Sequence, residues 1–254
     1  MSREGLGMGE ISIDQLSESL GWYGKMPSSG DFVHRRLDQS LIGWWHRWLS
    51  SGLVSMHESV LLSAEQEYLS APIWNFLIPA SLGCDMVQMG CLAPSRDRVG
   101  RAYPLLAVLY VPATQYEAQQ VSGSGRFYEH LGRSLLAAVG HGCSATQFEQ
   151  NIQGTRGMLT QMLTRASTQM VEDDGSSDIL DILNGGHETA PIEKLDQNDS
   201  RWPELALCFN SDAHNSYWWT NQANGAAQKS MVHGGALNIT LFNSLFITHT
   251  NFRL

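Results

Sequence analysis

The stretch Gly24–Phe32 concentrates side chains that could bind a ligand or a partner protein. They are an amine, two hydroxyls and a carboxylate, from Lys25, Ser28, Ser29 and Asp31. Pro27 presets φ for a turn and Gly30 can adopt a positive φ at no steric cost, so we expect a tight and rigid loop. Such a loop suits recognition. The alternative is that Asp31 and the serines only satisfy backbone N–H groups of the turn.

A second polar cluster precedes the most apolar run of the chain, Leu105–Val111. It consists of three arginines and one aspartate, Arg96, Asp97, Arg98 and Arg101. One interpretation is structural: Asp97 pairs with the arginines and closes the loop. The other is functional, because the planar guanidinium fork suits an anion or an acidic surface. The two interpretations are compatible.

No pattern typical of a catalytic site appears. The sequence contains no Gly-x-Ser-x-Gly, His-Glu-x-x-His, phosphate-binding or EF-hand motif, and its nine histidines are scattered. Lys25 with Asp31 could suggest acid–base chemistry, but two residues on one loop indicate binding more than catalysis. We therefore expect a protein that is not an enzyme and that has no cofactor and no metal site.

Composition narrows the class of partner and the compartment. The net charge of −9 argues against nucleic acid as a partner, since nucleic-acid binding depends on clustered Lys and Arg. The cysteines form no Cys-x-x-Cys pair and are typical of buried thiols in a reducing compartment; they are Cys84, Cys91, Cys143 and Cys208. The beginning of the chain does not resemble a signal peptide, and Leu105–Pro112 is far shorter than a membrane span of ~20 residues. We expect a cytoplasmic protein without direct membrane insertion.

The two polar clusters should lie at the ends of strands. Alternating or wholly apolar runs predict strands at 73–78, 86–92 and 105–111, the last buried on both faces, and the chain entering Gly24 reads as a strand end. A further hairpin is predicted from 205–209 and 217–220. We expect both loops side by side at one end of the sheet.

Helical periodicity accounts for much of the remaining chain. Asp38 is a plausible N-cap for a helix carrying a core stripe that includes Trp45 and Trp48, and a short helix is predicted at 65–69. Helices are also predicted over 127–139, from 144 onward with weak points at Gly154 and Gly157, and over 238–246. The fold class is therefore α/β (α+β): a central, mostly antiparallel sheet flanked by helices.

One domain is expected over residues 21–246. Residues 1–20 should form a flexible N-terminal tail and residues 247–254 a C-terminal tail. A variable acidic insertion is expected at about 171–199, with one helical turn around 179–183.

Several blocks of the sequence resemble signatures of the TagF family, also called ImpM, in the order that the family has them. Gly24–Phe32 is similar to a glycine-lysine-x-proline-serine-x-glycine-aspartate-phenylalanine signature, and Ala71–Phe76 and Pro94–Leu105 match two further blocks. Ser216–Thr220 resembles the closing serine-x-tryptophan-tryptophan-threonine strand. Asn238 departs from the pattern, because the family usually has proline there.

The resemblance implies a longin/SNARE-like α/β/α sandwich and an accessory role in bacterial type VI secretion. It further implies a post-translational repressor of assembly that binds secretion components, notably the forkhead-associated scaffold protein. We expect the contacts at Lys25, Ser28, Ser29, Asp31, Arg96, Asp97, Arg98 and Arg101. The alternatives are a binder of a small anionic ligand or phosphopeptide through the same loops, or a structural subunit of the secretion machine.

Overall fold

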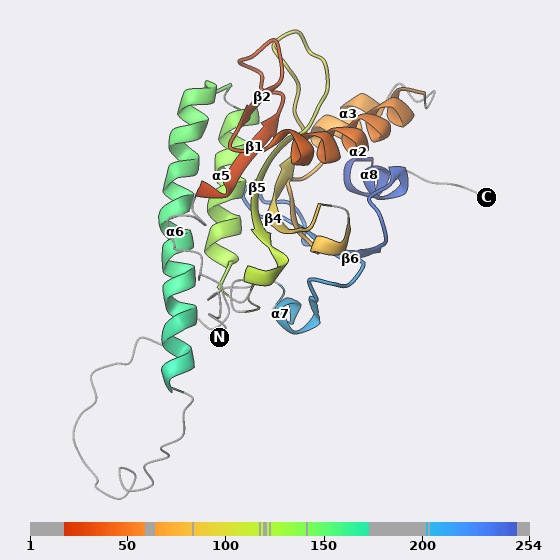
Figure 1. Ribbon diagram of the computed structural model, residues 1–254. Coiled ribbons are helices and arrows are strands. Elements are labelled where there is room, and N and C mark those ends of the chain that lie inside the picture. Colours follow the sequence, from red (N-terminus) through yellow and green to blue (C-terminus); the bar gives the residue numbers. More distant parts are fainter. Residues whose placement is uncertain are drawn as a thin grey trace, which may run out of the picture.

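A seven-stranded antiparallel sheet forms the centre of the protein (Figure 1). The computed structural model describes residues 18–58, 64–82, 84–116, 118, 121, 123–140, 142–172, 202 and 204–247. In chain order the strands are β1 (Leu20–Gly24), β2 (Val33–Arg35), β3 (Trp74–Ile78), β4 (Met86–Ala93), β5 (Leu105–Pro112), β6 (Asn215–Thr220) and β7 (Ser230–Gly234). Their order across the sheet is β2-β1-β5-β4-β3-β6-β7, so β2 and β7 are the edges.

Helices cover both faces of the sheet, which confirms the predicted layered architecture. One face carries α5 (Gly125–Gly140) and α6 (Ala145–Glu172), and the other carries α2 (Gln39–Glu58), α3 (Ala64–Ser70) and α8 (Ile239–Phe246), as Figure 1 shows. The core is therefore divided into two apolar clusters, one on each face. Burial of both clusters supplies the main driving force for folding.

The strand β5 contributes to both clusters, as its unbroken apolar sequence predicts. Leu105, Ala107 and Leu109 point to the α5–α6 side, whereas Leu106 and Val108 point to the α2–α8 side. Successive side chains of a strand point to opposite faces, so only an apolar run can serve two cores. The predicted strands at 73–78, 86–92 and 105–111 are confirmed as β3, β4 and β5.

Side-chain caps define where two helices begin. The Asp38 carboxylate accepts a hydrogen bond from the Leu41 backbone N–H at 2.8 Å, which confirms the predicted N-cap of α2. The Asn238 side chain accepts one from Leu241 N–H at 3.0 Å and caps α8. Asn238, which stands where the family usually has proline, therefore caps the start of α8 with a side-chain hydrogen bond. The indole rings of Trp45 and Trp48 are buried and confirm the predicted core stripe.

The predicted strand at 205–209 is wrong. Leu205–Cys208 forms a short helix, α7, in which Cys208 N–H donates to Glu204 O at 3.0 Å. Leu207, which the apolar pattern placed in a strand, is 88% exposed. Strand β6 pairs instead with β3, through Trp74–Leu77, and with β7.

Several boundaries also differ from expectation. β1 begins at Leu20 and Tyr110 N–H donates to Ser19 O, so the folded part begins inside the expected tail. Helix α6 continues past Gly154 and Gly157 to Glu172. The edge strands β2 and β7 were not predicted. Residues 1–17, the acidic insertion from 173 onward with its predicted turn at 179–183, and residues 248–254 lie outside the described residues.

The helices of the described residues include none with the length and apolarity needed to cross a bilayer.

The contact between α2 and α8 yields a stability prediction with a built-in control. A Cβ at Gly52 would overlap the Phe242 ring, whereas one at Gly43 on the same helix has only the Arg47 side chain near it, at 3.7 Å. Gly52→Ala should lower the free energy of unfolding by about 1–3 kcal/mol through overpacking. Gly43→Ala should raise it by up to about 1 kcal/mol, because alanine favours the helical backbone. Urea unfolding of both variants measures this, and effects of equal sign would contradict the packing described.

Candidate functional site

The two polar loops lie side by side at one end of the sheet, as predicted. Within the sheet Gly24, the end of β1, is paired with Leu105, the start of β5, and Leu105 is also paired with Ala93, the end of β4. The loop after β1 (residues 25–32, the first loop) and the loop before β5 (residues 94–104, the second loop) must therefore leave the sheet together. In Figure 1 they extend next to each other beyond β1 and β2.

The start of the first loop requires glycine. Gly24 has φ of 144°, and a Cβ there would overlap the Pro104 carbonyl oxygen of the second loop. The close approach of the two backbones is reinforced by Ser95, whose hydroxyl donates to Lys25 O at 2.8 Å. The Tyr68 hydroxyl of α3 both donates to Ser95 O and accepts from Ser95 N–H, each at 3.1 Å. The base of both loops is therefore fixed to the body of the protein.

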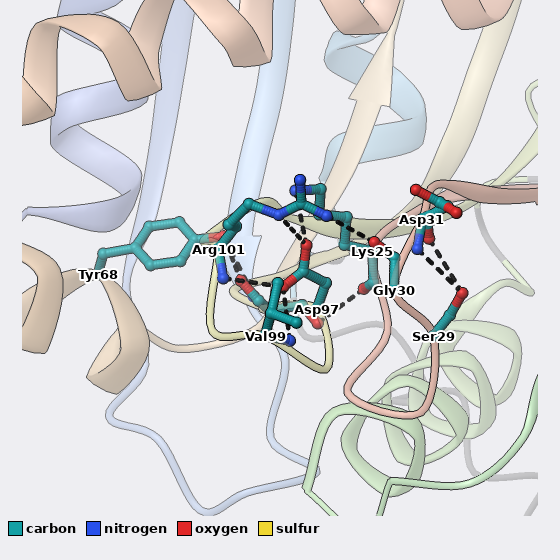
Figure 2. A network of polar contacts seen from close by, with 9 residues as sticks. Lys25, Ser29, Gly30, Asp31, Tyr68, Asp97, Val99 and Arg101 are labelled. Carbon is teal, nitrogen blue, oxygen red and sulfur yellow. Dashed lines mark hydrogen bonds and ion pairs between the residues drawn. The ribbon is translucent and has the colours of Figure 1, made fainter.

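Asp97 is the centre of the polar network that joins the loops (Figure 2). One carboxylate oxygen, Oδ2, lies 3.0 Å from Lys25 Nζ and 2.7 Å from Arg101 Nε. The other, Oδ1, accepts from the backbone N–H groups of Val99 at 3.0 Å and Arg101 at 2.9 Å. The Asp97 side chain is fully buried, and the Lys25 side chain is nearly so. Each buried charge is therefore compensated, as burial requires.

The protonation of Asp97 follows from these contacts. Burial would by itself raise the pKa of the Asp97 carboxyl, but the hydrogen bonds from Lys25 and Arg101 outweigh it and hold the pKa well below its usual value. The carboxylate is therefore ionised at any physiological pH.

Direct contacts between the loops extend the network to the surface. Arg98 N–H donates to Ser29 O at 2.9 Å, and Arg101 Nη2 donates to Gly30 O at 2.6 Å. The tip of the first loop also contacts the helix layer, because the Ser28 hydroxyl donates to Cys143 O at 2.8 Å. The two loops are therefore one rigid unit rather than two independent segments.

Five exposed residues of this unit define what we call the loop face: Asp31, Phe32, Arg96, Arg98 and Val99. Phe32 is 42% exposed and Val99 is 68% exposed. The guanidinium groups of Arg96 and Arg98 form no ion pair with any residue that the structure describes. The loop face thus combines unpaired positive charge with exposed apolar surface.

Phe32 is held in place by a cluster of aromatic side chains. Its ring stacks on Tyr23 with centroids 5.6 Å apart and meets Tyr103 edge-on at 4.7 Å. The Tyr23 and Tyr103 hydroxyls both lie within hydrogen-bonding distance of His46 Nδ1, at 2.9 and 3.1 Å. Lys25 Nζ lies 5.2 Å from the Phe32 ring centre. Burial raises the pKa of Tyr103, so its hydroxyl stays protonated.

The structure divides the predicted site residues into two groups. Lys25, Asp97 and Arg101 serve mainly to join the loops, although the Arg101 side chain is still 60% exposed. The structural interpretation of the arginine cluster is therefore borne out for Arg101 but not for Arg96 and Arg98. Ser28 and Ser29 hydrogen-bond to backbone carbonyls, of Cys143 and Asp31. Asp31, Arg96 and Arg98 remain available for a partner. Lys25 pairs with Asp97 and not with Asp31, so the two loop residues form no acid–base pair.

Sequence reasoning did not single out Phe32 and Val99 as contacts. The available signal was the position of each: a large apolar residue within a polar loop, next to Asp31 in one case and Arg98 in the other. Such residues are usually drawn into the core, and only the folded structure shows that these two are not.

Among the residues described, no three His, Cys, Asp or Glu side chains gather in a way that could hold a metal ion.

Comparisons with known proteins identify a matching family and a similar fold. The family model of the TagF N-terminal domain, described as type VI secretion system-associated, matches residues 21–155. The crystal structure of PA0076 from Pseudomonas aeruginosa PAO1 superimposes with a TM-score of 0.61 at 23% sequence identity, over 92% of this chain and 97% of that one. At this identity the likeness concerns the fold. No protein with a curated function shows significant similarity.

The network around Asp97 yields a second prediction. Asp97→Asn removes the negative charge opposite buried Lys25, so the free energy of unfolding should fall by about 3 kcal/mol. Asp31→Asn, at an exposed carboxylate of the same loop unit, is the matched control and should change it by no more than about 0.5 kcal/mol. Urea unfolding at neutral pH distinguishes the two. Equal stability of the two variants would show that Asp97 does not hold the loops together.

The lowered pKa of Asp97 makes part of this stability dependent on pH. Because the folded-state pKa lies below the unfolded value of about 3.9, the contribution is complete above that pH and is lost as pH falls through the folded pKa. The difference in unfolding free energy between wild type and Asp97→Asn should therefore be constant from pH 7 to about pH 5 and narrow below about pH 4. Unfolding curves across this range test it, and a difference that grows on acidification would contradict the assignment.

Proposed function

The chain belongs to the TagF family of type VI secretion system-associated proteins, and we propose that it is a regulatory subunit that acts by binding rather than by catalysis. In this proposal it is a cytoplasmic, post-translational repressor of secretion-system assembly. Its partner is a component of the system, and the forkhead-associated scaffold protein is the candidate that the family resemblance suggests. The loop face is the surface that makes the contact.

The observation that carries the proposal is the composition of the loop face. Arginine and aromatic residues are the types most enriched among the residues that dominate binding energy. Here Arg96 and Arg98 have no described counter-ion, and Phe32 and Val99 of the same two loops expose apolar surface. In a protein of net charge −9, a local excess of positive charge favours an acidic surface as the partner.

The rigidity of the loops supports the same conclusion. Ordering a flexible loop on binding costs conformational entropy, which lowers affinity. The contacts of Asp97, Ser95 and Arg101 have already ordered this unit within the free protein. A partner that contacts Phe32 and Arg98 would meet a surface that needs little rearrangement.

A second candidate function is recognition of a small anion or a phosphorylated peptide. It is favoured by the position of Arg98, whose Nη2 would lie 3.6 Å from a Cβ at Gly30, close to the carbonyl that Arg101 Nη2 contacts. Two guanidinium groups thus lie near one residue, and guanidinium groups are well suited to binding phosphate. A structural role in the assembled machine is a third candidate, which co-purification with sheath or baseplate would support.

Charge reversal at the loop face tests the proposal. Arg98→Glu, alone and with Arg96→Glu, should reduce recovery of the forkhead-associated scaffold protein in a pull-down by at least about tenfold, because loss of a central charged contact costs 2 kcal/mol or more. Arg101 is a poor choice, since its Nε contacts buried Asp97. Arg133→Glu on α5, whose side chain is exposed and contacts only Glu129 among described groups, is the matched control.

Two further measurements make the result interpretable. The melting temperatures of the three variants should stay within a few degrees of wild type, because none removes a buried contact. A thermal-shift assay with nucleotides and phosphopeptides addresses the second candidate function. Undiminished binding by the Arg96/Arg98 double variant would reject the loop face as the contact surface. A large shift with a phosphopeptide, without scaffold binding, would favour the second candidate.

A further inference from the structure

The edge strand β7 presents half of its backbone groups away from the sheet. In an antiparallel pair, residues that exchange hydrogen bonds with the neighbouring strand alternate with residues whose N–H and C=O groups point outward. Two bonds flanking the β6–β7 ladder fix the phase: Thr220 N–H donates to Lys229 O at 3.0 Å, and Gly235 N–H donates to His214 O at 2.6 Å. The odd-numbered residues 229–235 therefore face β6.

The even-numbered residues Ser230, Val232 and Gly234 therefore point their backbone N–H and C=O groups away from β6, and we call them the outward row. All three are exposed, and their N–H and C=O groups form no hydrogen bond with any residue in the described ranges. Val232 is 52% exposed, although it is a β-branched residue suited to cross-strand packing. A row of unpaired groups in an extended strand is a template for another strand.

The other edge of the sheet lacks this property. β2 has only three residues, two of which are His34 and Arg35. The Arg35 side chain donates to His34 O at 3.0 Å and so occupies an acceptor of its own strand. Arg36 follows with φ of 55°, which ends the extended conformation. Short length and charged residues are the usual protections of an edge strand, and β7 has no Lys, Arg, Asp, Glu or Pro.

The charge of this part of the chain bears on what could pair with β7. The last acidic residue of the sequence is Asp212, so β6, β7 and α8 contain none of the 25 Asp and Glu residues. Lys229 is the only Lys or Arg between Asp212 and Ile247. Two copies that meet at β7 therefore avoid the repulsion that other surfaces of an acidic protein would cause. A strongly charged segment would find little complementary charge here.

We propose that two copies of this chain pair antiparallel through β7, about a two-fold axis at Val232. In this register Val232 faces Val232 of the second copy, and Ser230 faces Gly234 in both directions. Every outward N–H and C=O of the row then has a partner, and the two exposed valines pack against each other. Lys229 lies opposite Gly235, so no like charges meet. The two sheets become continuous, and the loop face of each copy is not involved.

The proposal is independent of the proposed function, because it uses the opposite edge of the sheet from β1 and β2. A contact built on one short strand pair buries less than the ~1,000 Å² of a stable interface, so we expect a dimer with a micromolar dissociation constant. Sedimentation velocity of the full chain from about 1 to about 200 µM should show a concentration-dependent shift from monomer to dimer. A monomer throughout this range overturns the proposal.

Substitutions at Val232 test the register. Val232→Pro removes an N–H that faces outward, so it should raise the dissociation constant at least about tenfold while the monomer stays folded. Val232→Thr keeps the N–H and the β-branch and should change the constant only slightly. Circular dichroism and the melting temperature verify folding of each variant. A dimer that Val232→Pro leaves unchanged also overturns the proposal.

A charge exchange tests the two-fold axis and does not depend on the proline variant. Val232→Asp and Val232→Lys should each be monomeric, because like charges would face each other across the axis. An equimolar mixture of the two should form a heterodimer, since Asp then faces Lys. Recovery of association only in the mixture supports the axis at Val232. Two monomeric variants whose mixture stays monomeric, or variants that dimerise like wild type, contradict it.

Discussion

The charged contact between Asp97, Lys25 and Arg101 is the constraint on which the polar end of this protein depends. It connects the loop after β1 to the loop before β5 through one buried carboxylate, whose four hydrogen bonds leave it ionised. A buried ion pair is rarely a large net source of stability, but a buried lysine without its partner is strongly unfavourable. The contact therefore fixes the relative position of the loops, because alternative arrangements would leave a charge uncompensated.

In this arrangement the residues that hold the loops together differ from the residues that the loops expose to solvent. The strongly polar motif residues Lys25 and Asp97 are buried, while Phe32 and Val99, which are apolar, are exposed. The buried Lys25 and Asp97 are the informative part of this distribution, because charged residues are rarely buried unless they are paired. Membership of the TagF family connects the chain with type VI secretion, and the composition of the loop face is why we propose protein binding there.

The sheet itself has two unlike edges. β2, next to the polar loops, is short and carries Arg35, whereas β7 at the far side has no Lys, Arg, Asp, Glu or Pro, and no described strand pairs with its outer side. The helical layers cover the faces of the sheet but not its edges. Whether an edge strand can pair with another strand therefore depends on its length and its residue types. The difference fits two separate binding surfaces: the loop face, which would bind through its side chains, and β7, which would bind through its backbone. Dimerisation through β7 would leave the loop face free for a partner protein.

Local patterns in the sequence were enough to predict those elements that depend mainly on neighbouring residues. The apolar run of β5, the Asp38 cap of α2 and the family motif with Gly24 each depend on period, capping or φ within a few residues. From them followed the layered fold and the expectation that two loops meet at one end of the sheet. Both were confirmed, because antiparallel strands that follow one another leave few topologies open.

Only the tertiary structure decided which polar residues were buried and which apolar residues were not. Asp97 and Asp31 look alike in the sequence, but one accepts four hydrogen bonds in the interior and the other faces water. The same limitation made residues 205–209 resemble a strand, although 205–208 form a short helix that leaves Leu207 in solvent. Burial and strand pairing are properties of contacts between distant segments, and a local pattern carries no information about which segment will supply them.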